Sequence, residues 1–112
     1  MKYIENNSID PHYNLAFEEY VFKNLEHDED FVLLWRNGPS IIVGKNQNTV
    51  EEINMEYVRE NNIKVVRRVT GGGAVYHDLG NLNFSFIVKS GRNEDIDFKA
   101  YNIPIIKALE KL

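Results

Sequence analysis

Three segments of the chain place apolar residues at the spacing of a helix. Asp10 and Pro11 make a helix start, because an Asp side chain can accept from the first free N–H groups and Pro fits the first helical position. The apolar residues that follow predict a helix over 11–25. A second helix is expected around 50–58, where apolar residues share one face, and a third over 98–112.

Five shorter apolar runs are typical of strands. Gly38 and Pro39 separate the first two runs and mark a turn, so these runs are expected to pair as an antiparallel hairpin. In the last run, apolar residues beginning at Leu82 alternate with Asn83, Ser85 and Ile87, which is the period of a half-buried strand. The expected strands are 31–36, 40–44, 63–69, 74–78 and 82–88.

The order of these elements indicates the fold class. Helices and strands are interspersed, with polar connections at 26–30 and 90–97, but the strands come in hairpin-like pairs. This order predicts an α+β fold, with a mixed, mainly antiparallel sheet and helices packed on it.

Composition and charge narrow the class of protein. The 112 residues fit a single domain, 1–112, and a formal net charge of −4 argues against nucleic-acid binding through overall charge. Cysteine is absent, which excludes disulfides, thiol nucleophiles and cysteine metal sites within the chain. The first residues lack an apolar signal region, and no apolar run could span a bilayer. We therefore expect a cytoplasmic protein with no membrane partner.

The stretch from Arg67 to Gly73 carries the strongest chemical signal, with two adjacent arginines before three consecutive glycines. Glycines leave the backbone free to adopt positive φ and leave its N–H groups open to an anion. The Arg68 guanidinium could contact two oxygens of a phosphate bound there. A plain connection between strands, with solvated arginines, is the alternative that the residues alone leave open.

Other common site patterns are missing. The glycine loop is followed by neither the Lys-Ser/Thr of a Walker A motif nor a helix, so it matches neither a P-loop nor a dinucleotide fingerprint. The three histidines are scattered, so no metal site is expected. His77 and Asp78 are adjacent in an expected strand and point to opposite faces. His77 is therefore interpreted as a hydrogen-bonded, partly buried side chain or as pocket lining. Ser40 and Ser85 lack the glycines of a hydrolase nucleophile.

Two further features have both a structural and a functional interpretation. Trp35 is either part of the core or an apolar wall of a ligand pocket. Residues 44–48, Gly-Lys-Asn-Gln-Asn, are either a solvated loop or the polar rim of the same pocket.

Three blocks of sequence together resemble a known family. The twenty-residue run RRVTGGGAVYHDLGNLNFSF closely resembles the signature of lipoate–protein ligases, and YNLAFEEYVF and LLWRNGPSIIVGKNQN extend the resemblance in the right order. It covers the chain from about Pro11 to Val88. These enzymes form a superfamily with biotin–protein ligases and octanoyltransferases, so the resemblance implies a biotin/lipoate-ligase-like fold.

The resemblance implies a reaction in two steps. Lipoate and ATP, with Mg²⁺, give lipoyl-adenylate and pyrophosphate, and the acyl group then passes to a lysine of a lipoyl domain. The acceptors it implies are the lipoyl domains of 2-oxoacid dehydrogenase complexes or the glycine cleavage H protein. Backbone N–H groups and an arginine suit this chemistry, because they can neutralise charge that develops on the phosphorus oxygens.

Site residues follow from the resemblance position by position. It implies that ATP or the adenylate contacts Arg68, Gly73, Ala74, Val75 and Tyr76. It further implies that the pocket is lined by Gly71, Gly72, His77, Asp78 and Asn81.

One part of the family pattern is expected beyond Leu112. The family's catalytic lysine lies in a block downstream of the glycine loop, and none of Lys89, Lys99 and Lys107 sits in such a block. The last expected helix contains Pro104 and has no stop signal. We therefore expect the N-terminal part of a catalytic domain, with no catalytic residue in this chain. The alternatives are an ATP-independent lipoyl or octanoyl transferase, or an inactive binding module.

Overall fold

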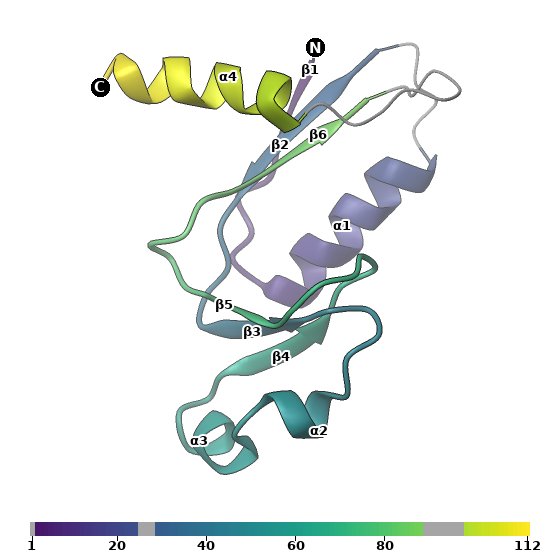
Figure 1. Ribbon diagram of the computed structural model, residues 1–112, viewed down its shortest axis with the longest axis vertical. Coiled ribbons are helices and arrows are strands. Elements are labelled where there is room, and N and C mark those ends of the chain that lie inside the picture. Colours follow the sequence, from purple (N-terminus) through teal and green to yellow (C-terminus); the bar gives the residue numbers. More distant parts are fainter. Residues whose placement is uncertain (1, 25–28, 89–97) are drawn as a thin grey trace.

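The computed structural model describes residues 2–24, 29–88 and 98–112, which fold into six strands and four helices (Figure 1). The strands are β1 (Lys2–Glu5), β2 (Phe31–Trp35), β3 (Ser40–Val43), β4 (Lys64–Arg67), β5 (Val75–His77) and β6 (Asn83–Ile87). The helices are α1 (Pro11–Asn24), α2 (Thr49–Glu52), α3 (Met55–Glu60) and α4 (Phe98–Glu110). The expected loop at 90–97, part of the expected connection at 26–30 and the expected helix end at residue 25 lie outside the described residues.

The strands form two mixed three-stranded sheets. One sheet has the order β1-β2-β6, with β1 parallel and β6 antiparallel to β2. The other has the order β4-β3-β5, with β4 parallel and β5 antiparallel to β3. The expected α+β class with a mixed sheet is confirmed, and parallel pairs are as numerous as antiparallel ones among the described strands.

The hairpin expected between 31–36 and 40–44 is wrong, because β2 and β3 belong to different sheets. Their link is held by the segment that precedes α1 instead. The Gly38 N–H donates to the Ile9 carbonyl over 2.8 Å, and Asn37 is fully buried against Asn14 of α1. These contacts direct the chain from one sheet into the other.

The helices largely follow their sequence signals. Asp10 caps α1 as expected, since its Oδ1 accepts from the His12 N–H over 3.0 Å. The helix expected around 50–58 is instead divided into α2 and α3, because the Asn54 side chain accepts from the Tyr57 N–H and starts a new helix. The last helix is confirmed as α4 and continues through Pro104.

The main core lies between α1 and the β1-β2-β6 sheet. Its buried members are Val21, Leu33, Trp35 and Ile87. β6 forms where expected, but its burial does not follow the expected alternation, because Ile87 is buried while Phe84 is 40% exposed. Ser85 lies on the face toward α1, since its hydroxyl donates to Glu18. This face of the strand is therefore partly polar.

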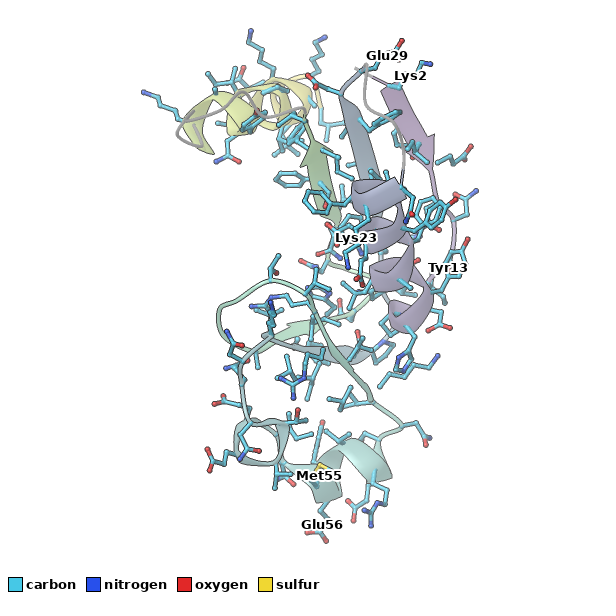
Figure 2. All side chains as sticks on the ribbon, turned by 90° about the vertical axis from the view of Figure 1, so that its right-hand side faces the viewer. Lys2, Tyr13, Lys23, Glu29, Met55 and Glu56 are labelled. Carbon is cyan, nitrogen blue, oxygen red and sulfur yellow. The ribbon has the colours of Figure 1, made fainter. Side chains whose placement is uncertain are left out.

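The molecule is elongated, with extents of 45 × 36 × 24 Å. In Figure 1, α4 lies at the end that carries β1, β2 and β6, while α2 and α3 lie at the other end, beyond β4. Figure 2 shows the same two ends from the side, one marked by Lys2 and Glu29, which form a salt bridge, and the other by Met55 and Glu56 of α3. α1 runs beside both sheets.

Candidate functional site

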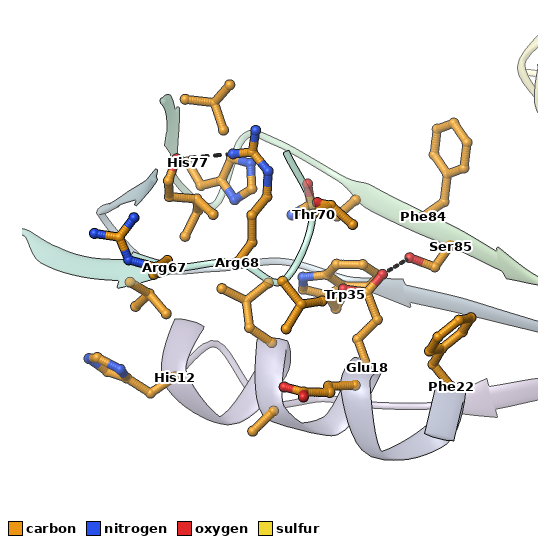
Figure 3. Close-up of a pocket in the computed structure, with 18 of the residues that line it drawn as sticks. His12, Glu18, Phe22, Trp35, Arg67, Arg68, Thr70, His77, Phe84 and Ser85 are labelled. Atoms are coloured by element: carbon orange, nitrogen blue, oxygen red, sulfur yellow. Dashed lines mark hydrogen bonds between the residues drawn. The ribbon is translucent and has the colours of Figure 1, made fainter. Parts of the chain in front are cut away.

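A cavity of about 620 Å³ lies between α1, the two sheets and the chain that follows β4. This volume is within the range of roughly 300–1,000 Å³ that is typical of small-molecule sites. Figure 3 shows Arg68 and His77 at one end, Phe22 and Phe84 at the other, and Trp35 between them. The cavity thus suits a ligand with a polar head and an apolar tail.

Arg68 holds the glycine loop in place. Its Nη2 donates to the Gly71 and Gly73 carbonyls at 2.9 and 2.8 Å, and its Nη1 donates to the Ile42 carbonyl at 3.3 Å. An arginine side chain has five N–H donors in a rigid fork, so these contacts leave others for a ligand. Arg68 therefore orders the loop and also lines the cavity.

Arg67 holds a second loop, a role that sequence reasoning missed. Its Nη1 donates to the carbonyls of Gly44, Lys45 and Gln47 at 2.9, 3.1 and 2.7 Å, and its Nη2 donates to the Thr49 hydroxyl at 2.7 Å. Adjacent strand residues point to opposite sides, so consecutive arginines can each serve a different loop. The pairing of two arginines was a signal for this division.

The two loops touch through their backbones. The Lys45 N–H donates to the Thr70 carbonyl over 2.9 Å. A Cβ built on Gly44 would lie only 2.0 Å from the Gly72 carbonyl oxygen, so this approach requires glycine. Gly72 itself has a φ of +108°, which side-chain-bearing residues rarely adopt. Residues 44–48, interpreted from sequence as a loop or a rim, thus support the glycine loop.

His77 lines the cavity and is hydrogen-bonded to Asn37. Its Nδ1 lies 3.0 Å from Nδ2 of the buried Asn37. Burial lowers the pKa of His77 below its usual 6.5, and the positive charge of Arg68 lowers it further. Both interpretations made from sequence therefore apply to the same side chain.

The remaining expected site residues divide into two groups. Val75 lines the cavity together with Arg68 and His77. The others are absent from its lining; these are Gly71, Gly72, Gly73, Ala74, Tyr76, Asp78 and Asn81.

The residues outside the lining still shape its surroundings. Tyr76 is 55% exposed, and the Asp78 carboxylate accepts from the Gly80 N–H. Asn81 donates to Asn83, which does line the cavity. A Cβ on Gly71 or Gly73 would meet nothing within 4 Å, so this part of the loop borders open space.

Trp35 combines its two expected roles. It is 7% exposed, belongs to the core and also forms part of the cavity wall. Its Nε1 and Nδ2 of the neighbouring Asn83 are buried donors without a hydrogen-bond partner in the described part of the chain. Both residues line the cavity, so these two donors lie buried within its wall.

The α1 side of the cavity was also missed by sequence reasoning. His12, Glu18 and Phe22 line it, and Glu18 accepts a hydrogen bond from Ser85 of β6. The helical pattern of α1 indicates its length but not that one side faces a ligand cavity.

Two features are absent from the described part of the chain. Within 2–24, 29–88 and 98–112, no group of three or more His, Cys, Asp or Glu side chains could hold a metal ion. In the same ranges, no helix has the length and apolar character needed to cross a membrane.

Comparison with known proteins identifies the family of this arrangement. The model of the lipoyl protein ligase A/B catalytic domain matches residues 10–112. The chain is 58% identical to lipoate–protein ligase 1 of Staphylococcus aureus and 57% identical to lipoate-protein ligase LplJ of Bacillus subtilis. In both cases the match covers 100% of the chain and 34% of the relative, so the chain spans about a third of their length.

Solved structures agree with the sequence comparison. A putative lipoate protein ligase from Thermoplasma acidophilum with bound lipoic acid matches with a TM-score of 0.86 and 32% identity, over 99% of this chain and 47% of that one. A lipoate-protein ligase A bound with ATP matches with a TM-score of 0.83 and 30% identity, over 97% of this chain and 45% of that one. The chain therefore belongs to the lipoyl protein ligase A/B catalytic domain family.

Proposed function

We propose that this chain is the lipoate- and adenylate-binding part of an enzyme that attaches lipoate to a lysine of lipoyl domains, using ATP and a lipoyl-adenylate intermediate. The observation that carries the proposal is the cavity, which has aromatic side chains at one end and Arg68 with His77 at the other. Lipoate has the matching shape, an apolar tail ending in a carboxylate. The relatives solved with lipoic acid and with ATP support both substrates.

In the proposed first step, the lipoate carboxylate attacks the α-phosphorus of ATP and pyrophosphate leaves. Two anions must approach each other, so positive charge and N–H donors at the polar end lower the barrier. Arg68 already lies there, with the loop that it holds. We assign ATP or adenylate contacts to Arg68, Gly73, Ala74, Val75 and Tyr76, and Mg²⁺ is proposed to accompany the nucleotide.

Five further residues in and after the glycine loop are proposed to complete the pocket. They are Gly71, Gly72, His77, Asp78 and Asn81. His77 and Asn81, the latter through Asn83, are connected to the cavity wall.

In the proposed second step, the amine of an acceptor lysine attacks the acyl carbon and AMP leaves. A bi-partite lipoate protein ligase from Thermoplasma acidophilum has been solved in a study that includes its E2 lipoyl domain, and the chain matches it with a TM-score of 0.86. Lipoyl domains of 2-oxoacid dehydrogenases, or the glycine cleavage H protein, are accordingly the proposed acceptors. The family lysine expected downstream of Leu112 is proposed to assist both steps. Because the reaction consumes ATP, the cytoplasm is its proposed compartment.

The test is lipoate-dependent ATP–pyrophosphate exchange by the full natural protein. Arg68→Ala should slow exchange by about 2–3 kcal/mol in activation free energy, as expected for a lost charge-assisted contact. Gly73→Val should also slow it, by placing a side chain in the path of the ligand. Arg59→Ala, which removes the same charge from α3 at the far end of the molecule, is the matched control. Normal exchange by both site variants would show that the site is placed wrongly.

The same assay separates the two alternatives. Transfer from synthetic lipoyl-adenylate without any exchange would favour an ATP-independent transferase. Robust lipoylation of an apo lipoyl domain by the 112-residue chain alone would refute the proposal that a downstream lysine is needed.

A further inference from the structure

The buried side-chain amides of Asn14 and Asn37 connect α1 to His77 in the wall of the cavity. Asn14, which is 1% exposed, contacts Asn37, which is 0% exposed, and Asn37 contacts the ring of His77. Buried amides keep a fixed orientation when each of their groups has a partner. The donor and acceptor of each hydrogen bond in this series can therefore be worked out, starting from Asn14.

The orientation of the Asn14 amide is determined by its backbone contacts. Its Nδ2 lies 2.9 Å from the Ser8 carbonyl oxygen and 3.0 Å from the Arg36 carbonyl oxygen. Backbone carbonyls can only accept, so this end of the Asn14 amide must be the NH₂ group. Its Oδ1 in turn accepts from Asn6 over 2.9 Å. These contacts therefore distinguish the nitrogen of the Asn14 amide from its oxygen, two atoms that are otherwise hard to tell apart.

Asn37 follows from Asn14. The Asn14 NH₂ group also lies 2.8 Å from Asn37, and an amide nitrogen cannot accept a hydrogen bond, so the Asn37 atom facing it must be the oxygen. The two Asn14 hydrogens are then shared among three oxygens. The opposite end of Asn37 is then its NH₂ group, which lies 3.0 Å from Nδ1 of His77. A donor facing this nitrogen requires that Nδ1 carry no proton.

We propose that Asn14 and Asn37 are positioning residues that hold His77 as the neutral tautomer with its proton on Nε2. The ring lines the cavity, and no described residue is hydrogen-bonded to Nε2. Nε2–H is therefore the donor that His77 offers to a ligand oxygen, such as one of a carboxylate, an acyl carbonyl or a phosphate. Donation to lipoate rests on the proposed function, whereas the tautomer does not.

This tautomer assigns His77 a different role from that of a base. Protonation at Nδ1 would set two donors against each other, and the low pKa of His77 acts in the same direction. The titratable groups around the cavity are Arg67, Arg68, His12, Glu18 and Glu19. With the free lone pair turned toward Asn37, His77 binds an oxygen and does not remove a proton from an incoming amine.

The test reads the tautomer directly by ¹⁵N NMR of the full chain labelled at histidine. The signals of His77 are assigned by their loss in His77→Gln. His12, which is exposed although it borders the cavity, gives the tautomer ratio of a solvent-accessible ring in the same sample. We expect His77 to show at least a tenfold larger ratio of Nε2–H to Nδ1–H than His12. A ratio equal to or below that of His12 would overturn the proposal.

Asn37→Asp is the decisive variant, because it replaces one NH₂ group by an oxygen of nearly the same size. The carboxylate still accepts from Asn14 but now also accepts from His77, so Nδ1 should acquire a proton. Asn102→Asp, an exposed position on α4, makes the same chemical change away from the cavity and should leave the ratio unaltered. An Asn37→Asp protein that folds and keeps His77 Nδ1 free of a proton would contradict the proposal that Asn37 determines the tautomer of His77. If this variant does not fold, the ratio in the unsubstituted chain still decides.

Addition of lipoate to the labelled full natural protein separates this inference from the proposed function. We expect the Nε2–H resonance of His77 to shift on binding while Nδ1 stays unprotonated. Movement of the proton to Nδ1 would refute the role of Nε2 as the donor. The absence of any lipoate-dependent change in the spectrum would refute the proposed function and leave the tautomer, measured without ligand, supported.

Discussion

Replacement of Gly44 by alanine tests whether the contact between the two loops organises the site. The new Cβ would lie 2.0 Å from the Gly72 carbonyl oxygen, 3.0 Å from the Gly72 carbonyl carbon and 3.2 Å from Oε1 of Gln47. The Gln47 side chain can rotate away, but the other two atoms belong to the backbone. The glycine loop itself must therefore move.

The displacement can be estimated from these distances. Ordinary contact begins at 3.4 Å, so the oxygen must retreat by about 1.4 Å from its position at 2.0 Å. A shift of this size breaks the hydrogen bond from Lys45 N–H to the Thr70 carbonyl, which is 2.9 Å long. Overpacking costs about 1–3 kcal/mol and a lost hydrogen bond about 1 kcal/mol, so we expect a destabilisation of about 2–4 kcal/mol.

The assay is urea unfolding, checked by thermal unfolding. For a domain of this size, about 2 kcal/mol corresponds to a fall in Tm of roughly 8 °C. Gly73→Ala is the matched control, because its Cβ meets nothing within 4 Å and its loop is the same. A Gly44→Ala protein no less stable than Gly73→Ala would show that the two loops do not depend on each other.

Substitutions at three further positions test single features of the fold. Asp10→Ala should lower the free energy of unfolding, because it removes the cap on the His12 N–H, whereas Asp10→Asn should retain most of the stability; equal losses in urea unfolding would contradict the cap. Arg67→Ala should cost about 2 kcal/mol through the loss of its carbonyl contacts, and a loss no larger than that of Arg59→Ala would refute its role. The folded state lowers the pKa of His77, so the unfolded chain binds the proton more readily, and the free energy of unfolding should fall as the pH drops below about 6.5. His77→Gln should reduce this dependence of stability on pH. Asp10 does not interfere, because its lowered pKa means that its stabilising effect is lost only below about pH 3.8. An unchanged dependence in His77→Gln would exclude His77 as its source.

The glycine segment shows how far sequence reasoning could reach into the site. A phosphate contact was expected for Arg68 because of the nearby glycines, and the structure places Arg68 and His77 together at the cavity. The ligand contacts themselves stay a prediction. Asn37 could not have been selected from sequence, since an asparagine before Gly-Pro is typical of any turn. Its importance comes from burial, which depends on the whole fold.

The strands provide the same lesson about the fold. The sequence located β2, β3 and the turn between them, but it predicted a hairpin where the chain passes from one sheet to another. β1 was not predicted at all, because its four residues are largely exposed and gain their strand geometry by pairing with β2. Local patterns indicate where a strand lies, whereas its partners depend on segments far away in the chain.

The sequence by itself determined most of the elements, the Asp10 cap, the glycine loop and the family signature, because each of these depends on residues within a few positions of one another. The tertiary structure decided which loop each arginine holds, which face of α1 borders the cavity and which atom of His77 carries its proton. Asn37 and His77 are 40 positions apart, and Arg67 and Gly44 are 23 apart. Such contacts arise only when burial and strand pairing bring distant segments together, so no local pattern records them.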